Sequence, residues 1–286
     1  MSVQRAIMAA SVALLGSVGA SEPMHAQEMR AVGMSRQLHD TSAVAVQVRL
    51  GAGRLELGAA DGRLLYDLRA RFQPAAVEAL HTWDATDRRA VLGLRGLEGD
   101  NLSRVTERSP APELAVDLGR GAAIDLDLDL GAVQADLDLG GLRLSRVHMS
   151  SGASDSHLRF SSPNPVHMSS LEVQVGAAEL TMERLADANT GLVRVSSGLG
   201  SVDLDFSGTW QRDIALQLEV ALGSVRIRVP RSVGVSVEHS RFLGRFDTTG
   251  LEKRGDRWVT PDFDAASYKL VIRAHTAIGK LSLDRS

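Results

Sequence analysis

The repeat that decides the fold is clearest in residues 192–229, LVRVSSGLGSVDLDFSGTWQRDIALQLEVALGSVRIRV. Apolar and polar residues alternate before Gly198 and again after Gly200, and the same pattern returns around Gly223. Alternation with a period of two is typical of a β-strand with one buried face, and glycine permits a turn or a close backbone approach. Each unit is therefore predicted to supply short strands joined at a glycine corner.

The glycine corners recur along the chain at a nearly constant interval. Gly131, Gly152, Gly176, Gly200 and Gly223 are separated by 21, 24, 24 and 23 residues. A period in the low twenties indicates stacked units that bury their apolar faces against one another. The chain is therefore predicted to be all-β, a single-domain β-solenoid with parallel strands in successive coils. An antiparallel β-sandwich of hairpins has the same alternation and is the alternative.

The N-terminus has the features of an export signal. Residues 1–26 contain one basic residue, Arg5, then an apolar stretch and the small-residue pattern Met24-His-Ala26. These features predict a cleaved signal peptide, and the stretch is shorter than a membrane anchor requires. The mature protein is expected to be periplasmic or extracellular, with no integral membrane segment.

The remaining chain divides into regions of different regularity. Residues 27–42 are polar and are predicted to be a linker, whereas residues 43–115 are predicted to form an N-terminal β subregion. Residues 116–286 carry the regular corners and are predicted to form a repeat domain. Within it, residues 236–268 lose the rhythm and are predicted to form an irregular end cap, as exposed solenoid ends require covers.

Composition excludes several functional classes. The 286 residues include no Cys, which removes disulfides, thiolate metal sites, cysteine nucleophiles and a lipid-modified N-terminal cysteine. The formal net charge is −3 and no dense basic run occurs, so the composition argues against nucleic-acid binding. Aromatic residues make up 4% of the chain, which weakens any interpretation based on stacking of sugars or bases.

Several segments resemble known families of bacterial envelope proteins. Residues 46–57, VQVRLGAGRLEL, and the stretch from Leu114 to Gly131 resemble the toast-rack N-terminal domain. Residues 220–230, VALGSVRIRVP, and the ending AIGKL at 277–281 resemble LiaF-type C-terminal domains and adhesin-like β-repeat domains. LiaF-type proteins are similar to envelope-stress regulators that act beside a membrane sensor kinase. The resemblance implies architecture and no catalytic, cofactor-binding or metal-binding residue.

Two clusters are candidates for metal binding. Asp125, Asp127 and Asp129 share one strand face, where carboxylates of neighbouring coils could converge on a hard cation such as Ca²⁺. The alternative is a solvated face that keeps the sheet soluble. The pentapeptide VHMSS occurs at 147–151 and 166–170, so His148 could lie near His167 if both copies occupy equivalent places. The alternative is stacked buried Met with His at the surface.

The sequence contains no recognised catalytic motif. Gly-x-Ser-x-Gly, His-Glu-x-x-His and phosphate-binding loops do not occur. We therefore expect an exported, non-enzymatic envelope protein, an interaction or adhesion-type scaffold that takes no cofactor. Its expected partner is an envelope protein or a surface polymer. The alternatives are an accessory factor in envelope-stress sensing and an enzyme that acts on polysaccharide, the latter by fold analogy.

Overall fold

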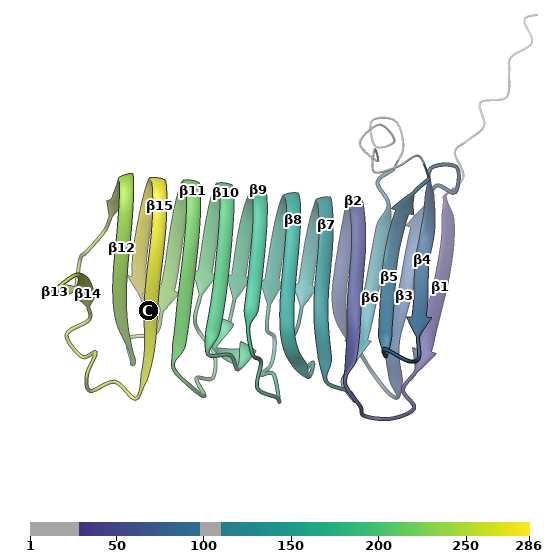
Figure 1. The fold of residues 1–286 in the computed structure, drawn as a ribbon, viewed down its shortest axis with the longest axis horizontal. Coiled ribbons are helices and arrows are strands. Elements are labelled where there is room, and N and C mark those ends of the chain that lie inside the picture. Colours follow the sequence, from purple (N-terminus) through teal and green to yellow (C-terminus); the bar gives the residue numbers. More distant parts are fainter. Residues whose placement is uncertain (1–28, 98–109) are drawn as a thin grey trace, which may run out of the picture.

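The computed structural model describes residues 29–97 and 110–286, which form one long, twisted sheet (Figure 1). Its strands are β1 (Arg30–Gln37), β2 (Val44–Ala60), β3 (Leu64–Phe72), β4 (Val77–Asp84), β5 (Arg89–Gly96), β6 (Glu113–Gly119), β7 (Ile124–Asp138), β8 (Leu144–Arg159), β9 (Leu171–Glu183), β10 (Leu192–Asp205), β11 (Ile214–Val229), β12 (Val233–Phe246), β13 (Glu252–Arg254), β14 (Arg257–Val259) and β15 (Tyr268–Arg285).

The central strands pair in parallel, one coil per strand. β7 through β11 follow each other in chain order, and β15 lies next to β11 in the same parallel register. The predicted β-solenoid is confirmed, and the antiparallel sandwich is excluded by these ladders. Antiparallel pairs occur only near the two ends of the described sheet, where β1, β3 and β6, β4 and β5, and β12 to β14 meet.

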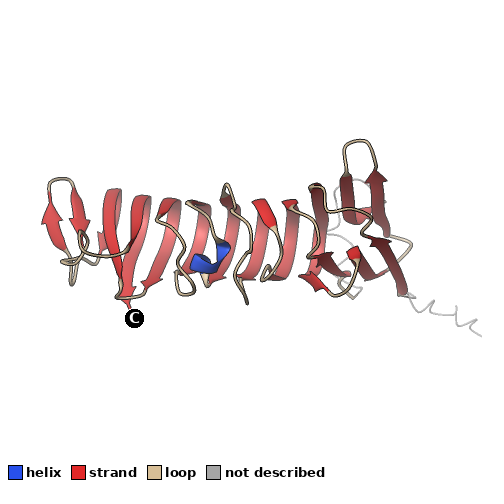
Figure 2. Ribbon diagram, turned by 90° about the horizontal axis from the view of Figure 1, so that it is seen from below, coloured by secondary structure: helices blue, strands red, loops and turns tan. Residues whose placement is uncertain are grey.

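Each coil is one long strand that bends, rather than two separate strands. In β10, Val193 and Val195 face the core before the bend, and Val202 and Leu204 face it afterwards. The alternation therefore changes phase by one residue, because two consecutive residues point outward at the bend. The two arms of each strand enclose the core, and loops run between successive coils on the side opposite the bend (Figure 2).

The bend is built from two stacked columns of small residues. Gly131, Gly152, Gly176 and Gly198 follow one another in the first column, each with its Cα facing the carbonyl of the one before. Gly200, Gly223 and Gly279 belong to the second column, two positions further along each strand. Gly176 belongs to the first column and Gly200 to the second, so the 24 residues between them exceed the offset between β9 and β10, which is 22 residues.

The order of coils departs from the order of the chain at both ends. β15, the last strand, inserts between β11 and β12, and β2 lies between the later strands β6 and β7. The arms of β2 pair with different strands, the first with β5 and the second with β6. The sheet therefore runs without a break across the predicted boundary at residues 115 and 116.

The end segments differ from the sequence-based prediction. The predicted linker at 27–42 contains β1, which pairs antiparallel with β3 because a polar strand is acceptable at an exposed edge. The predicted irregular cap at 236–268 begins with β12, a regular strand up to Phe246. The short β13–β14 hairpin covers β12 only at Ser236 and Val237. The predicted signal peptide, residues 1–26, lies wholly outside the described residues.

Candidate interaction surface

The outer side of the bend is a continuous surface across successive coils. Three rows of residues cross the strands there: the first glycine column, an outward-pointing row one residue later, and the second column. Parallel pairing in register keeps residues of one type aligned, since adjacent strands lie about 4.8 Å apart. The surface is therefore a set of ladders, each contributed by one position of the repeat.

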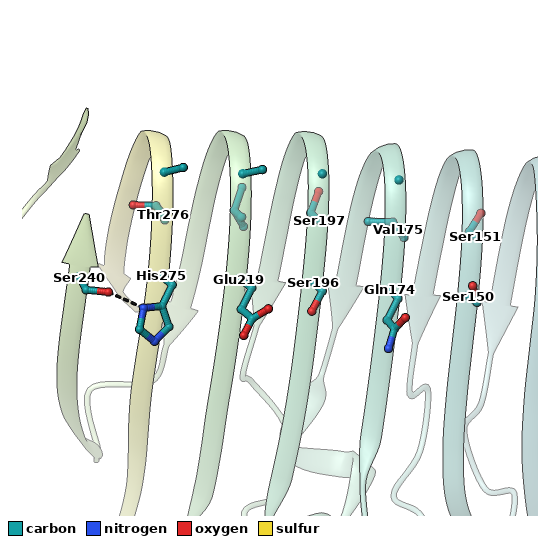
Figure 3. A pocket seen from close by; sticks show the side chains of 15 residues that line it. Ser150, Ser151, Gln174, Val175, Ser196, Ser197, Glu219, Ser240, His275 and Thr276 are labelled. Atoms are coloured by element: carbon teal, nitrogen blue, oxygen red, sulfur yellow. Dashed lines mark hydrogen bonds between the residues drawn. The ribbon is translucent and has the colours of Figure 1, made fainter. Parts of the chain in front are cut away.

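A groove of about 830 Å³ follows this bend over β8 to β12. Its floor includes Gly176, Gly198, Ala221 and Ala277, which are too small to project into it. Along one side runs a ladder of polar side chains, one from each strand (Figure 3). In spatial order they are Ser150, Gln174, Ser196, Glu219, His275 and Ser240.

Two neighbouring side chains of the polar ladder, Ser240 and His275, are joined by a hydrogen bond. The Ser240 hydroxyl shares a hydrogen bond with Nδ1 of His275, and Glu219 stands on the opposite side of His275 in the register (Figure 3). This order matches the nucleophile, base and acid of a hydrolase. All three side chains are exposed to water, however, whereas catalytic electrostatics depends on a water-excluded site. The arrangement offers exposed donors and acceptors to a polar ligand.

Two hydroxyls beneath the groove have no hydrogen-bond partner. Ser151 and Ser197 are 6% and 5% exposed, and their Oγ atoms are buried without a partner among the described residues. They occupy the last inward position before the bend, where Val175 and Val220 stand in neighbouring coils.

An apolar ridge borders the groove. It consists of Leu199, Leu222 and Ile278, which are aligned on β10, β11 and β15 and are about half exposed. Each follows a small residue and precedes a glycine, in the tripeptides Gly-Leu-Gly, Ala-Leu-Gly and Ala-Ile-Gly. This recurring tripeptide breaks the alternation and is the sequence signal that identifies the ridge, although it also fits a simple glycine corner.

The predicted acidic face exists, and arginines of adjacent coils neutralise part of it. Asp125 pairs with Arg146 at 2.9 Å and Asp129 with Arg49 at 3.8 Å. The hydrogen bond with Asp125 raises the pKa of the Arg146 guanidinium. Asp127 lies between them, level with His148 of the next coil. Within residues 29–97 and 110–286 no group of three or more potential ligands is arranged to hold a metal ion.

The two copies of VHMSS do not occupy equivalent places. The first copy lies in β8, where His148 is level with Glu172 of β9, while the second lies in the loop that leads into β9. The copies are 19 residues apart, but the coil offset there is 24 residues, so His148 and His167 are not brought into register. Met149 and Met168 are both fully buried, and His167 is exposed.

No helix in the described part of the chain has the length and apolar character needed to cross a bilayer. A family model described as the N-terminal domain of toast_rack, DUF2154, matches residues 25–169. No curated protein was found to match the chain.

Two solved structures match the chain at low similarity. One is a candidate cell adhesion protein from Clostridium sporogenes, with 13% identity and a TM-score of 0.47, covering 91% of this chain and all of that one. The other is a candidate adhesin from Bacteroides fragilis, with 10% identity and a TM-score of 0.34, covering 89% of this chain and 97% of that one. These values are too low for a functional comparison.

Proposed function

The chain belongs to the toast_rack N-terminal domain family, whose model matches just over half of it, and from this premise we propose that it is an exported, non-enzymatic scaffold of the bacterial envelope. Its binding surface is the groove along the bend, and its partner is an extended chain, either a surface polymer or a segment of an envelope protein. The observation that carries the proposal is the groove itself, a linear polar ladder over a floor of small residues.

The chemistry of the groove suits an elongated partner. Its donors and acceptors repeat at the strand spacing of about 4.8 Å, so a linear ligand can use several of them in succession. The supporting coils are well packed, since the inward residues on either side of the bend are almost fully buried. A preorganised surface loses little conformational freedom on binding.

Filling the groove floor is expected to abolish partner capture. Ala221 is exposed on the floor, so Ala221→Tyr places a bulky ring there without entering the core. The tagged mature chain would be used to capture partners from a crosslinked envelope fraction, with mass spectrometry and glycan analysis of the bound material. We expect at least one species to be captured by the unmodified chain and lost with Ala221→Tyr.

Ala132→Tyr is the matched control, because Ala132 is exposed at the bend of β7 outside the groove. It should capture the same species as the unmodified chain. Equal capture by all three chains would disprove the groove as the binding site. Capture of a membrane sensor kinase would instead favour the accessory role in envelope-stress sensing. Ester or glycan turnover by purified protein that is lost in Ser240→Ala would overturn the non-enzymatic proposal.

Export is expected to remove the first 26 residues. Intact-mass measurement of the protein recovered from cells should place its N-terminus at Gln27, which follows the Met24-His-Ala26 pattern. The protein should leave the cytoplasmic fraction upon cell fractionation. A chain that retains Met1 and stays in the cytoplasm would contradict the export proposal while leaving the groove experiment unaffected.

A further inference from the structure

The apolar ridge has no covering segment among the described residues. Leu199, Leu222 and Ile278 are 51%, 45% and 46% exposed, and they are neighbours in the parallel register of β10, β11 and β15. The next residue of the ladder, on β9, is the small Ala177. A contiguous row of large exposed apolar side chains marks a contact with another molecule more often than an isolated leucine does.

A ladder of charges flanks the ridge on the side of the second arm. From β8 to β12 it consists, in spatial order, of Asp155, Glu179, Ser201, Ser224, Lys280 and Arg245. The signs run negative, negative, neutral, neutral, positive, positive. If a second copy of the ladder is placed against the first in the reverse order, each negative residue therefore meets a positive one. The centre of this arrangement lies between β10 and β11.

These four charges are available for a contact. None of Asp155, Glu179, Lys280 and Arg245 makes an ion pair or a side-chain hydrogen bond with another described residue, and all four are exposed. One row further along the second arm, by contrast, Asp136 pairs with Arg159 and His157 with Glu183. Lys280 also helps to lower the pKa of the Asp247 carboxyl, after the larger effect of hydrogen bonds from Thr249.

We propose that the ridge joins two copies of this chain across a two-fold axis perpendicular to the solenoid axis, at the level between β10 and β11. The two ridges then run antiparallel, and Leu199 of one copy packs against Leu222 of the other. The same rotation places Glu179 opposite Lys280 and Asp155 opposite Arg245, twice each per dimer. Isologous contacts of this kind use one self-complementary patch on both subunits.

The sizes of the ridge residues fit the same arrangement. The rotation sets Ala177 opposite Ile278 of the second copy, so a small side chain receives a large one. On the other flank it sets Gln174 opposite His275 and Ser196 opposite Glu219, which are compatible polar pairs. No like charges meet on either flank.

A two-fold axis along the solenoid would be a poorer arrangement. Each ridge residue would then lie opposite the same residue of the second copy. The charged ladder of one copy would lie against the polar ladder of the other. Lys280 would then face His275, while Asp155 and Glu179 would face Ser150 and Gln174. Because the opposite charges would not meet, the charge pattern favours the antiparallel arrangement.

Charge reversal tests the orientation directly. Glu179→Lys alone and Lys280→Glu alone each create two like-charged pairs per dimer, so each is expected to weaken dimerisation about tenfold or more. The double variant Glu179→Lys/Lys280→Glu restores both pairs and should restore the dimer. The measurement is sedimentation equilibrium of the mature chain from micromolar to near-millimolar concentration, with thermal unfolding to check that each variant folds.

The packing of the two ridges is tested in the same way, by a single variant that breaks the contact and a double variant that restores it. Leu199→Glu alone should abolish the dimer, and Leu199→Glu/Leu222→Lys should restore it, because the antiparallel arrangement pairs position 199 with position 222. Val271→Glu is the control for an added charge, since Val271 is 37% exposed on the first arm of β15, away from the ridge. Lys253→Glu on β13 is the control for charge reversal.

The outcomes separate this proposal from its rivals. A chain that stays monomeric throughout the concentration range would overturn it. A dimer unaffected by Leu199→Glu, or one that the double variants fail to restore, would also overturn it. Open-ended oligomers would instead point to pairing of the free strand edges. Loss of the dimer has no bearing on capture of a polymer by monomers, so this experiment can fail while the proposed function stands.

Discussion

Alanine in place of Gly200 is expected to destabilise the central coils severely, by about 3–5 kcal/mol, or to prevent folding. Gly200 has a φ of 133°, a region that residues with a side chain rarely adopt. A Cβ at this position would lie 1.8 Å from the carbonyl oxygen of Ala178 in the coil beneath. Ala178 is the partner of Gly200 in the parallel register of β9 and β10, so its carbonyl cannot move away without disturbing the pairing of these strands.

The conformational part of this cost can be measured separately. Gly62 also has a positive φ, 78°, but a Cβ there would meet no atom within 4 Å. Gly62→Ala should therefore cost only about 1 kcal/mol, from backbone strain alone. Urea and thermal unfolding would compare the two variants, and hydrogen exchange on β9 to β11 would locate the damage. Equal stability of the two variants would show that close coil stacking does not require glycine at position 200.

Alanine in place of Asn164 is expected to cost about 3 kcal/mol, although the side chain lies in a loop. Asn164 is fully buried where the chain passes from β8 to β9. Its amide donates to the carbonyls of Leu144 and Ala188 at 2.9 and 3.2 Å, and its side-chain oxygen accepts from the N–H groups of Leu144 and Val166. Truncation leaves these backbone groups buried without partners, which is the costly case for a hydrogen bond.

The loop side of the solenoid is held together by a short series of such contacts. Asn189, one coil further along, donates to the carbonyls of Asn164 and Val166 and accepts from Arg212 of the next loop. Loss of Asn164 should therefore raise hydrogen exchange in the loops on both sides. Ser162→Ala is the matched control, because Ser162 is exposed in the same loop. A thermal midpoint for Asn164→Ala equal to that of Ser162→Ala would refute the expectation.

The two proposed uses of the bend are coupled. In the antiparallel dimer the polar ladders of both copies face each other, so a bound polymer and a second copy compete for the same side of the molecule. Partner capture should therefore be strongest at concentrations where the chain is monomeric. Glu179→Lys, which opposes dimerisation but lies outside the groove lining, should capture at least as well as the unmodified chain.

Much of the core could be predicted from residue order. Every strand in the coils from β7 to β11 shows the expected alternation on both arms, and the apolar residues of the inward positions, such as Leu126, Leu137 and Ile227, are buried. The corner glycines also lie at the bend as predicted. The sequence does not reveal that these glycines form two columns, because Gly198 and Gly200 are only two residues apart and offsets of 22 and 24 residues both fit an irregular repeat.

The candidate sites were less predictable. The acidic face was visible as a pattern, but its arginine partners come from β2 and β8, and a strand sequence does not tell which strand will be its neighbour. Likewise, identical pentapeptides suggested equivalent positions for His148 and His167, yet one copy became strand and the other became loop. The difference lies in the following residues: Leu171 begins the next alternation directly after the second copy.

The alternation of side chains by itself determined that the repeated coils are β-strands and which face of each strand is buried, because these properties depend on neighbours along the chain. Only the tertiary structure decided the order of the coils. β15 lies between β11 and β12, and β2 lies between β6 and β7, although their sequences would fit any parallel neighbour. Lengthening a connection costs little additional entropy, so chain order does not fix strand order. The ridge, the groove and the charge ladder exist because distant segments stack in register, and this stacking is settled only when the whole sheet forms.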